Sequence, residues 1–281
     1  MNPVPHISIV TPSYNQATFL DETLRSVRDQ DYPSFEHIVV DGASSDGSVE
    51  ILKQRSAQPG WSHLRWISER DKGQSEALNK GFRLATGDIV GWLNSDDTYA
   101  AGCFKEVAQA FAADPRIGVL YGDYNWIDER GNLLQVRKEI EFSRFNLLFN
   151  RICIINSSAS LFLRRDIFQS GHFLDEQLHY AMDYEFYLRL LYGGYRFKHL
   201  GKVLGSFRWH SDSKTSNFAS RQAREIKAAR EKHVPCLQKM NGSAAKYVTM
   251  VSLGMLATML RWGKKAACGY YFKRRGNRRT T

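Results

Sequence analysis

The chain has 281 residues, which is enough for one large domain or two small ones. Hydrophobic residues make up 43% of it, an ordinary fraction for a soluble globular protein. The net charge of +10 comes from the end of the chain, because residues 236–281 contain ten Lys/Arg and no Asp or Glu, which leaves residues 1–235 neutral. The overall charge therefore says little about an active site in the body.

The first five residues have no basic region and no apolar core, so no signal peptide is expected. The four cysteines (Cys103, Cys153, Cys236 and Cys268) are scattered and form no close pair. Such spacing resembles neither a disulfide framework nor a zinc site. A reducing cytoplasmic setting is the expectation.

The first hundred residues alternate predicted strands and helices. Runs of β-branched and apolar residues predict strands at 6–10, 37–41, 64–68 and 88–93, and helical spacing predicts helices at 18–29, 48–54 and 73–85. This order predicts a mainly parallel, doubly wound α/β sheet. Right-handed crossovers would bring the loops after the strands, 11–15, 41–47, 71–73 and 94–97, to one edge, where such folds bind ligands.

The pattern changes beyond residue 115. A hairpin is predicted from 119–124 and 133–136, and further strands at 158–163, 195–200 and 205–210. Helical spacing predicts helices from near Ala100, at 180–192 and at 216–233.

Two adjacent carboxylates, Asp96 and Asp97, follow the buried fourth strand. Like charges side by side repel, and a divalent cation between them and a diphosphate would relieve this. Mg²⁺ and Mn²⁺ are often held by one or two carboxylates plus substrate phosphates. The alternative is a solvated loop in which Asp97 caps the next helix.

Other strand ends carry candidate nucleotide ligands. Asp41 can accept a hydrogen bond from a nucleobase imide or a ribose hydroxyl. Lys72 and the first amides of the helix after Asp71 can meet a phosphate, although a simple cap with a turn at Gly73 explains the same residues. The sequence has no Gly-x-Gly-x-x-Gly after the first strand and no Walker A motif, which argues against a nicotinamide dehydrogenase and a P-loop ATPase.

These segments together resemble family 2 glycosyltransferases with the GT-A fold. The resemblance is carried by Thr11-Pro12-Ser13-Tyr14-Asn15, Asp41-Gly42-x-Ser44-x-Asp46-Gly47, Asp71-x-Gly73 with Ala77, Asn79 and Gly81, Gly87-Asp88, and Asn94-Ser95-Asp96-Asp97. It covers about the first hundred residues in the right order and spacing, and extends more loosely to Asp183 and Arg208-Trp209-His210.

The resemblance implies an inverting sugar transfer, of the hexosyl or N-acetylhexosaminyl type, from a nucleotide-diphosphate sugar. A UDP-sugar is the commonest donor in the family, and Mn²⁺ or Mg²⁺ is the usual cofactor. Asp96 stands where the metal-binding Asp-x-Asp motif has its second acid, Asn94 replaces the first, and Asp97 and His210 are further candidate metal ligands. We expect the nucleotide to be bound by Pro12, Tyr14, Asn15, Asp41, Asp46, Asp71, Lys72, Gly73, Asn94 and Ser95.

An inverting transfer also needs a carboxylate that takes the acceptor proton while the leaving diphosphate is stabilised. Met182-Asp183-Tyr184-Glu185 resembles the family segment in which an acid at the start of a helix is the base. Asp183 is the predicted base and Glu185 the second candidate. The alternative is that Asp183 is only an acid favoured by the helix dipole.

The segment Tyr247 to Leu260 is uncharged, and as a helix it would be about 21 Å long, short of the roughly 30 Å hydrocarbon core. Basic and aromatic residues follow it. This combination predicts peripheral attachment to an anionic membrane surface. A helix packed on the body with a basic end is the alternative. Because no nucleic-acid module accompanies the tail, nucleic acid is not an expected partner.

We therefore expect a glycosyltransferase on the inner face of the cell membrane that acts on a glycan or lipid-linked acceptor in cell-surface polysaccharide synthesis. The GT-A domain is predicted at 1–235, with a nucleotide-binding half at 1–100 and a smaller acceptor half at 101–235, and the membrane-associating helical tail at 236–281. A nucleotidyltransferase is one alternative, although residues 11–15 lack its usual Gly and basic residues. A non-catalytic nucleotide-sugar-binding protein of the same fold is the other.

Overall fold

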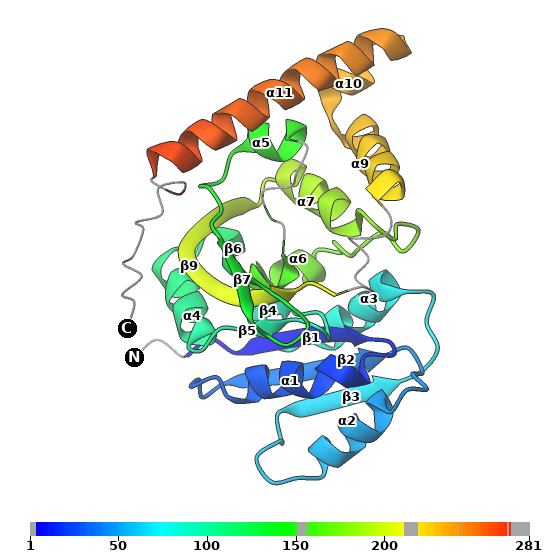
Figure 1. Ribbon diagram of the computed structural model, residues 1–281, viewed down its shortest axis with the longest axis vertical. Coiled ribbons are helices and arrows are strands. Elements are labelled where there is room, and N and C mark those ends of the chain that lie inside the picture. Colours follow the sequence, from blue (N-terminus) through cyan, green and yellow to red (C-terminus); the bar gives the residue numbers. More distant parts are fainter. Residues whose placement is uncertain are drawn as a thin grey trace, which may run out of the picture.

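The computed structural model describes residues 4–150, 155, 157–210, 219–240, 242–268 and 270. Within these residues nine strands form one sheet, ordered β3-β2-β1-β4-β8-β6-β9-β5, with β7 paired to β6 (Figure 1). The strands are β1 Ile7–Ser13, β2 Phe35–Asp41, β3 Leu64–Ser68, β4 Ile89–Trp92, β5 Thr98–Tyr99, β6 Ile117–Ile127, β7 Leu133–Arg137, β8 Leu161–Arg164 and β9 Arg196–Arg208.

The first half of the sheet is parallel. Strand β1 pairs in parallel with β2 and β4, and β2 pairs in parallel with β3. Helices cross over between these strands: α1 Ala17–Arg28, α2 Ser48–Ser56 and α3 Gln74–Leu84. The central strands are apolar and buried because helices cover both of their faces. The predicted doubly wound α/β sheet is confirmed.

Alternate side chains of the sheet enter two separate cores. Ile9 and Leu120 pack with Phe104 on one face, under helix α4 Cys103–Ala113. Val10 and Leu163 pack on the opposite face in the core that also contains α3 and helix α7 Met182–Tyr192. This division follows from the two-residue repeat of a strand.

The second half of the sheet is mixed. Strand β8 is antiparallel to β4 and β6, whereas β6 and β9 are parallel, and the predicted hairpin is formed by β6 and β7. The two strands predicted at 195–200 and 205–210 are one bent strand, β9, whose register against β6 shifts along its length (Figure 1). A Cβ at Gly205 would lie 2.3 Å from the carbonyl oxygen of Ala159, so the missing side chain lets the chain pass close to its neighbour.

Some boundaries differ from the prediction. The helix expected near Ala100 starts at Cys103, after the short strand β5 and Gly102, whose φ is +75°. The strand expected at 158–163 begins with a 3-10 turn, η1 Ser158–Ser160. Three helices are too short for periodicity to reveal them: α5 Arg144–Phe149, α6 Asp166–Gln169 and α10 Pro235–Gln238.

The C-terminal part consists of α9 Ala219–His233, α10 and the long helix α11 Ser243–Ala267, which extends beyond the predicted 247–260. Helix α11 lies across the top of the molecule over α5 (Figure 1). Its Ala257 is fully buried, and Arg261 donates to Glu139 at 2.5 Å. The helix is therefore docked on the body. Among the described residues no helix has the length and apolarity of a transmembrane span.

Candidate active site

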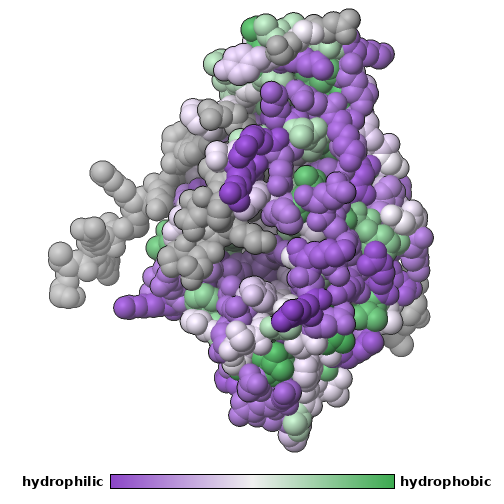
Figure 2. Space-filling view, turned by 90° about the vertical axis from the view of Figure 1, so that its right-hand side faces the viewer, coloured by the Kyte–Doolittle hydropathy of each residue, from purple (hydrophilic) through white to green (hydrophobic). Residues whose placement is uncertain are grey.

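A cavity of about 880 Å³ opens where the loops after β1, β2, β3 and β4 meet the start of α7. The face of the molecule in Figure 2 is mostly hydrophilic around a central hollow. Ten of the predicted site residues line the cavity: Pro12, Tyr14, Asp71, Lys72, Gly73, Asn94, Ser95, Asp96, Asp183 and His210. The convergence of strand-end loops predicted from the crossovers is therefore present.

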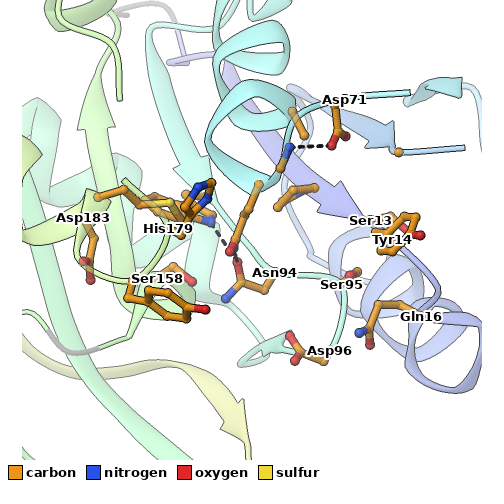
Figure 3. A pocket seen from close by; sticks show the side chains of 18 of the residues that line it. Ser13, Tyr14, Gln16, Asp71, Asn94, Ser95, Asp96, Ser158, His179 and Asp183 are labelled. Carbon is orange, nitrogen blue, oxygen red and sulfur yellow. Dashed lines mark hydrogen bonds between the residues drawn. The ribbon is translucent and has the colours of Figure 1, made fainter. Parts of the chain in front are cut away.

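The lining residues fall into two groups (Figure 3). Tyr14 and Asp71 lie on one side, while His179 and Asp183 lie on the other, with Asp96 and its loop between them. Tyr14 is 63% exposed, so its ring is available to stack on a planar group. The cavity thus has Tyr14 with the carboxylate of Asp71 on one side and His179 with the carboxylate of Asp183 on the other.

Three predicted nucleotide ligands, Asp41, Asp46 and Asn15, do not line the cavity. Asp41 is fully buried and accepts hydrogen bonds from the hydroxyls of Ser44 at 2.5 Å and Ser68 at 2.7 Å. The carboxylate of Asp41, which was expected to bind a nucleobase or a ribose hydroxyl, is therefore hydrogen-bonded to neighbouring serines instead.

Asp46 and Asn15 bind neighbouring loop backbone. Asp46 accepts from the amide of Ala17 at 2.8 Å, and the Asn15 side-chain oxygen accepts from the amide of Ser45 at 3.0 Å. Burial pushes the pKa of Asp46 upward, but hydrogen bonds from Ala17 and Ser48 outweigh it and hold the pKa below its usual value. These two residues hold the β1 and β2 loops together beside the cavity.

The helix α3 begins at the cavity edge. Gly73, with a φ of +135°, precedes it, and the amide of Gly73 donates to Asp71 at 2.8 Å. Burial is the main cause that raises the pKa of Asp71. Lys72 is exposed at the same edge. A helix N-terminus beside a lysine suits a phosphate group.

Asn94 is held by three hydrogen bonds. Its side-chain oxygen accepts from Gln74 and Trp92, both at 2.9 Å, and its amide donates to Asp97 at 3.3 Å. The oxygen that would have to ligate a cation therefore already has two donors.

Asp97 points into the protein, and the structure separates it from the cavity that Asp96 faces. It is 1% exposed and accepts the backbone N–H of Arg208 at 2.9 Å. Burial, and then the neighbouring charge of Asp96, raise the pKa of Asp97 well above its usual value. Asp97 therefore does not face the cavity, where the expected metal contact would be. It is not a helix N-cap either, because the strand β5 follows it.

Asp96 lines the cavity and is 2.9 Å from Nε2 of His210. The imidazole is 4% exposed, and its ring also contacts Phe19, with centroids 4.9 Å apart. A carboxylate oxygen and an imidazole nitrogen this close at a cavity wall are a suitable pair of ligands for one cation.

A buried arginine, Arg208, fixes the Asp96 loop. The guanidinium of Arg208 is fully buried and donates to the carbonyl of Asp96 at 2.8 Å, to the carbonyl of Glu129 at 3.1 Å, and to the carboxylate of Glu22 at 2.6 Å. Arg208 thus ties the loop after β4 to the β6–β7 turn and to α1.

Asp183 is the second residue of α7 and is half-buried in the cavity wall. Burial raises its pKa to about 6, although hydrogen bonds from the amides of Tyr184 and of Asp183 itself act in the opposite direction. Glu185 is 2% exposed and is paired with Arg189 and His233 at 2.9 and 2.8 Å. Of the two predicted bases, only Asp183 reaches the cavity.

Other lining residues were missed because they belong to no strand-end motif: Ser157, Ser158, His179, Tyr180, Tyr187, Phe207 and Gln222. The hydroxyls of Ser157 and Ser158 are buried and have no hydrogen-bond partner in the described part of the chain. Lys214 and Ser216, which follow His210 in the chain, lie outside the described residues, as do the basic residues beyond Tyr270.

Residues 8–171 match the model of glycosyl transferase family 2. The chain belongs to this family. An uncharacterised glycosyltransferase of Mycobacterium tuberculosis is 32% identical over 191 residues, which cover 67% of this chain and 70% of that protein. This family 2 protein is accordingly a glycosyltransferase, which favours sugar transfer over the nucleotidyltransferase and non-catalytic alternatives.

Two solved structures share the fold of this glycosyltransferase. Staphylococcus aureus TarS in complex with UDP-GlcNAc has a TM-score of 0.63 and 19% identity, and covers 96% of this chain and 74% of that chain. The mannosyltransferase PcManGT from Pyrobaculum calidifontis, in complex with GDP-Man and Mn²⁺, has a TM-score of 0.60 and 20% identity, and covers 96% and 82%. The fold is therefore that of GT-A glycosyltransferases, as the sequence predicted.

Proposed function

We propose that this glycosyltransferase moves a sugar, with inversion, from a nucleotide-diphosphate sugar to a hydroxyl of a glycan or lipid-linked acceptor in cell-surface polysaccharide synthesis. The observation that carries the proposal is that Asp96 and Asp183, from different parts of the chain, line one cavity. A leaving diphosphate near Asp96 and an acceptor hydroxyl near Asp183 would then lie on opposite sides of the reacting carbon. The nucleotide sugars bound by TarS and PcManGT support a donor of this class.

Mn²⁺ or Mg²⁺ fits the pair Asp96 and His210. The described residues contain no group of three His, Cys, Asp or Glu able to hold a metal, so diphosphate oxygens and water would complete the ligand set. When bound, the cation supplies Lewis-acid stabilisation of the leaving diphosphate. Neither Asn94 nor Asp97 belongs to this proposed pair, because their side chains are engaged within the loop.

The residues of the chain would divide the remaining work. Lys72 and the first amides of α3 would bind phosphate oxygens, and Tyr14 would stack on the nucleobase. Asp183 would accept the proton of the acceptor hydroxyl. A pKa near 6 suits this role, because the group is ionised at neutral pH yet more basic than an ordinary aspartate.

The outward face of α11 supports peripheral contact with the inner face of the cell membrane. Its exposed apolar side chains follow helical spacing: Tyr247, Val248, Val251, Met255, Met259 and Trp262. Lys264 is exposed in the last turn, whereas Lys265 lies 3.6 Å from Glu139 on the docked side. An exposed apolar helical face with a lysine at its end is a pattern that binds anionic lipid surfaces, and a lipid-linked acceptor would be concentrated there.

A panel of nucleotide sugars with and without Mn²⁺, read by thermal shift, tests the donor part of the proposal. A ligand at one hundred times its dissociation constant stabilises the folded state by about 2.7 kcal/mol. We expect one nucleotide sugar to raise the melting temperature, more so with Mn²⁺. If the panel leaves the melting temperature unchanged under both conditions, the proposed donor class is wrong.

A further inference from the structure

Glu225, on α9, binds the segment that leads into the helix bearing Asp183. Its carboxylate accepts three consecutive backbone N–H groups, from His179 at 3.3 Å, from Tyr180 at 2.8 Å and from Ala181 at 2.8 Å. Ala181 is the residue directly before α7. Helix α9 also lies beyond residues 8–171, which the family model matches.

The first amides of a helix lack partners within that helix and favour a nearby anion. An aspartate in this position is normally stabilised in its charged form, which makes it a weak base. Here Glu225 accepts the amides of residues 179–181, directly before α7. The carboxylate of Asp183 accepts a hydrogen bond from the amide of Tyr184 at 2.7 Å. Two carboxylates therefore share the positive end of one helix.

Three further contacts fix α9 along α7. Gln222 donates to the carbonyl of Tyr180 at 3.1 Å, Arg230 donates to the hydroxyl of Tyr184 at 2.8 Å, and His233 is 2.8 Å from the buried Glu185. The two helices lie side by side in Figure 1. Because α9 is attached at both ends of this contact, Glu225 has a fixed position relative to Asp183.

We propose that Glu225 is a positioning residue for the base: it binds the residues directly before α7 and so sets where α7 begins and that Asp183 faces the cavity. This inference rests on the proposed role of Asp183. Burial is the larger cause of the raised pKa of Asp183, and the charge of Glu225 adds to it. Other titratable or charged groups line the cavity with Asp183. Tyr187 comes from α7 itself, and the others come from other segments: Tyr14, Arg70, Asp71, Lys72, Asp96, His179, Tyr180 and His210.

The test is Glu225→Gln, which keeps a side chain of similar size and an accepting oxygen but removes the charge. Carbon-13 NMR of the side-chain carboxyls, with the Asp183 signal assigned through Asp183→Asn, measures the pKa directly and needs no substrate. We expect Asp183 to titrate near 6 in the wild type and at a lower pH in the variant, still above the ordinary aspartate value of about 3.9, because burial, the larger cause, remains. The low-pH limb of the transfer rate should move in the same direction.

Glu231→Gln is the matched control, because it removes the same charge from α9 at a place from which no hydrogen bond reaches 179–181 among the described residues. Glu225→Asp keeps the charge with a shorter reach, so it should lower the rate while Asp183 still titrates near 6. This variant keeps the test decisive if Glu225→Gln does not fold. An unchanged Asp183 pKa in Glu225→Gln, or a pKa in Glu225→Asp that falls toward 3.9, would overturn the inference. If transfer does not depend on Asp183, so that Asp183→Asn keeps full activity, the proposed function is defeated instead. The NMR measurement of the Asp183 pKa needs no substrate and is independent of that result.

Discussion

Asp96 and Asp97 are adjacent in the chain but have opposite environments. Asp96 faces the cavity beside His210, whereas Asp97 is buried against Arg208 and Asn94. The pair was recognisable from the sequence because it follows a buried strand. Which of the two acids faces the ligand depends on the packing of Arg208, a residue more than a hundred positions away, and no local pattern contains that information.

Asn94→Asp tests this division of roles. The change would place a carboxylate against Asp97, whose pKa is already raised by burial and by Asp96. We expect the free energy of unfolding to fall by about 1–3 kcal/mol, and no gain in Mn²⁺ affinity. A carboxyl group whose pKa is higher in the folded than in the unfolded protein loses stabilising free energy as the pH rises through its folded-state pKa. The loss of stability in Asn94→Asp, relative to the wild type, should therefore grow as the pH rises.

Asn94→Ala is the control, since it removes the same hydrogen bonds without adding charge. Denaturant unfolding at several pH values measures both variants. Tighter Mn²⁺ binding by Asn94→Asp at unchanged stability would show that position 94 is a metal ligand after all.

Asp183 sets a pH dependence for transfer. Its pKa of about 6 lies above that of an ordinary aspartate, so the base becomes protonated, and transfer declines, as the pH falls through about 6. Asp183→Asn should lower the turnover number by about a hundred- to ten-thousand-fold, with the dissociation constant of the donor unchanged. Steady-state kinetics over pH, with calorimetry of donor binding, measure both. An acid limb near 4, or full turnover in the asparagine variant, would remove Asp183 from the mechanism.

At the level of helices and strands, the part of the site formed by the loops after β1, β3 and β4 was predictable from the chain order, whereas on the other side only Asp183 and His210 were predicted, from the family resemblance. Pro12, Asp71 and Asp96 follow strands of a repeating β-α-β unit, and such strand ends must share one edge of the sheet. Tyr180, Gln222 and the bent β9 are brought to the cavity by long-range packing, for which a single sequence carries no periodic signal.

The bend of β9 gives a prediction of its own. Gly205→Ala would place its Cβ 2.3 Å from the carbonyl of Ala159 and 2.8 Å from that of Thr98, so a backbone must shift. Overpacking of this kind costs typically 1–3 kcal/mol. At Gly201, on the same strand, a Cβ meets nothing within 4 Å, so Gly201→Ala is the matched control. Chemical denaturation of the two variants should separate them, and equal stabilities would contradict the close approach seen here.

In the whole molecule, α11 fits both interpretations that the sequence left open: a helix packed on the body and a helix that contacts a membrane surface. Its inner face is docked on the body through Ala257 and Arg261, while its outer face exposes Met255 at 64% and Met259 at 69%. The sequence predicted an apolar helix, but which face would be covered depended on α5 and Glu139, which lie far away in the chain.

The outer face of α11 predicts binding to anionic vesicles. Exchanging both Met255 and Met259 for Glu removes exposed apolar groups that would enter the lipid surface and adds repulsion. The exchange should weaken binding more than about tenfold, since 1.4 kcal/mol is already tenfold. Leu133→Glu, at an equally exposed site on β7, should have no effect. Cosedimentation with phosphatidylserine vesicles measures this, and equal binding by all three proteins would exclude α11 as the contact.

The proposed transfer requires that one cavity holds the donor diphosphate at Asp96 and His210, with the base Asp183 on the other side of the sugar. A crystal structure of the Asp183→Asn variant with a nucleotide sugar and Mn²⁺, the metal located by anomalous scattering, tests it most directly. We expect Mn²⁺ to be bound by Asp96 and His210 and the anomeric carbon to face position 183. A nucleotide bound elsewhere, or a sugar directed away from position 183, would contradict it.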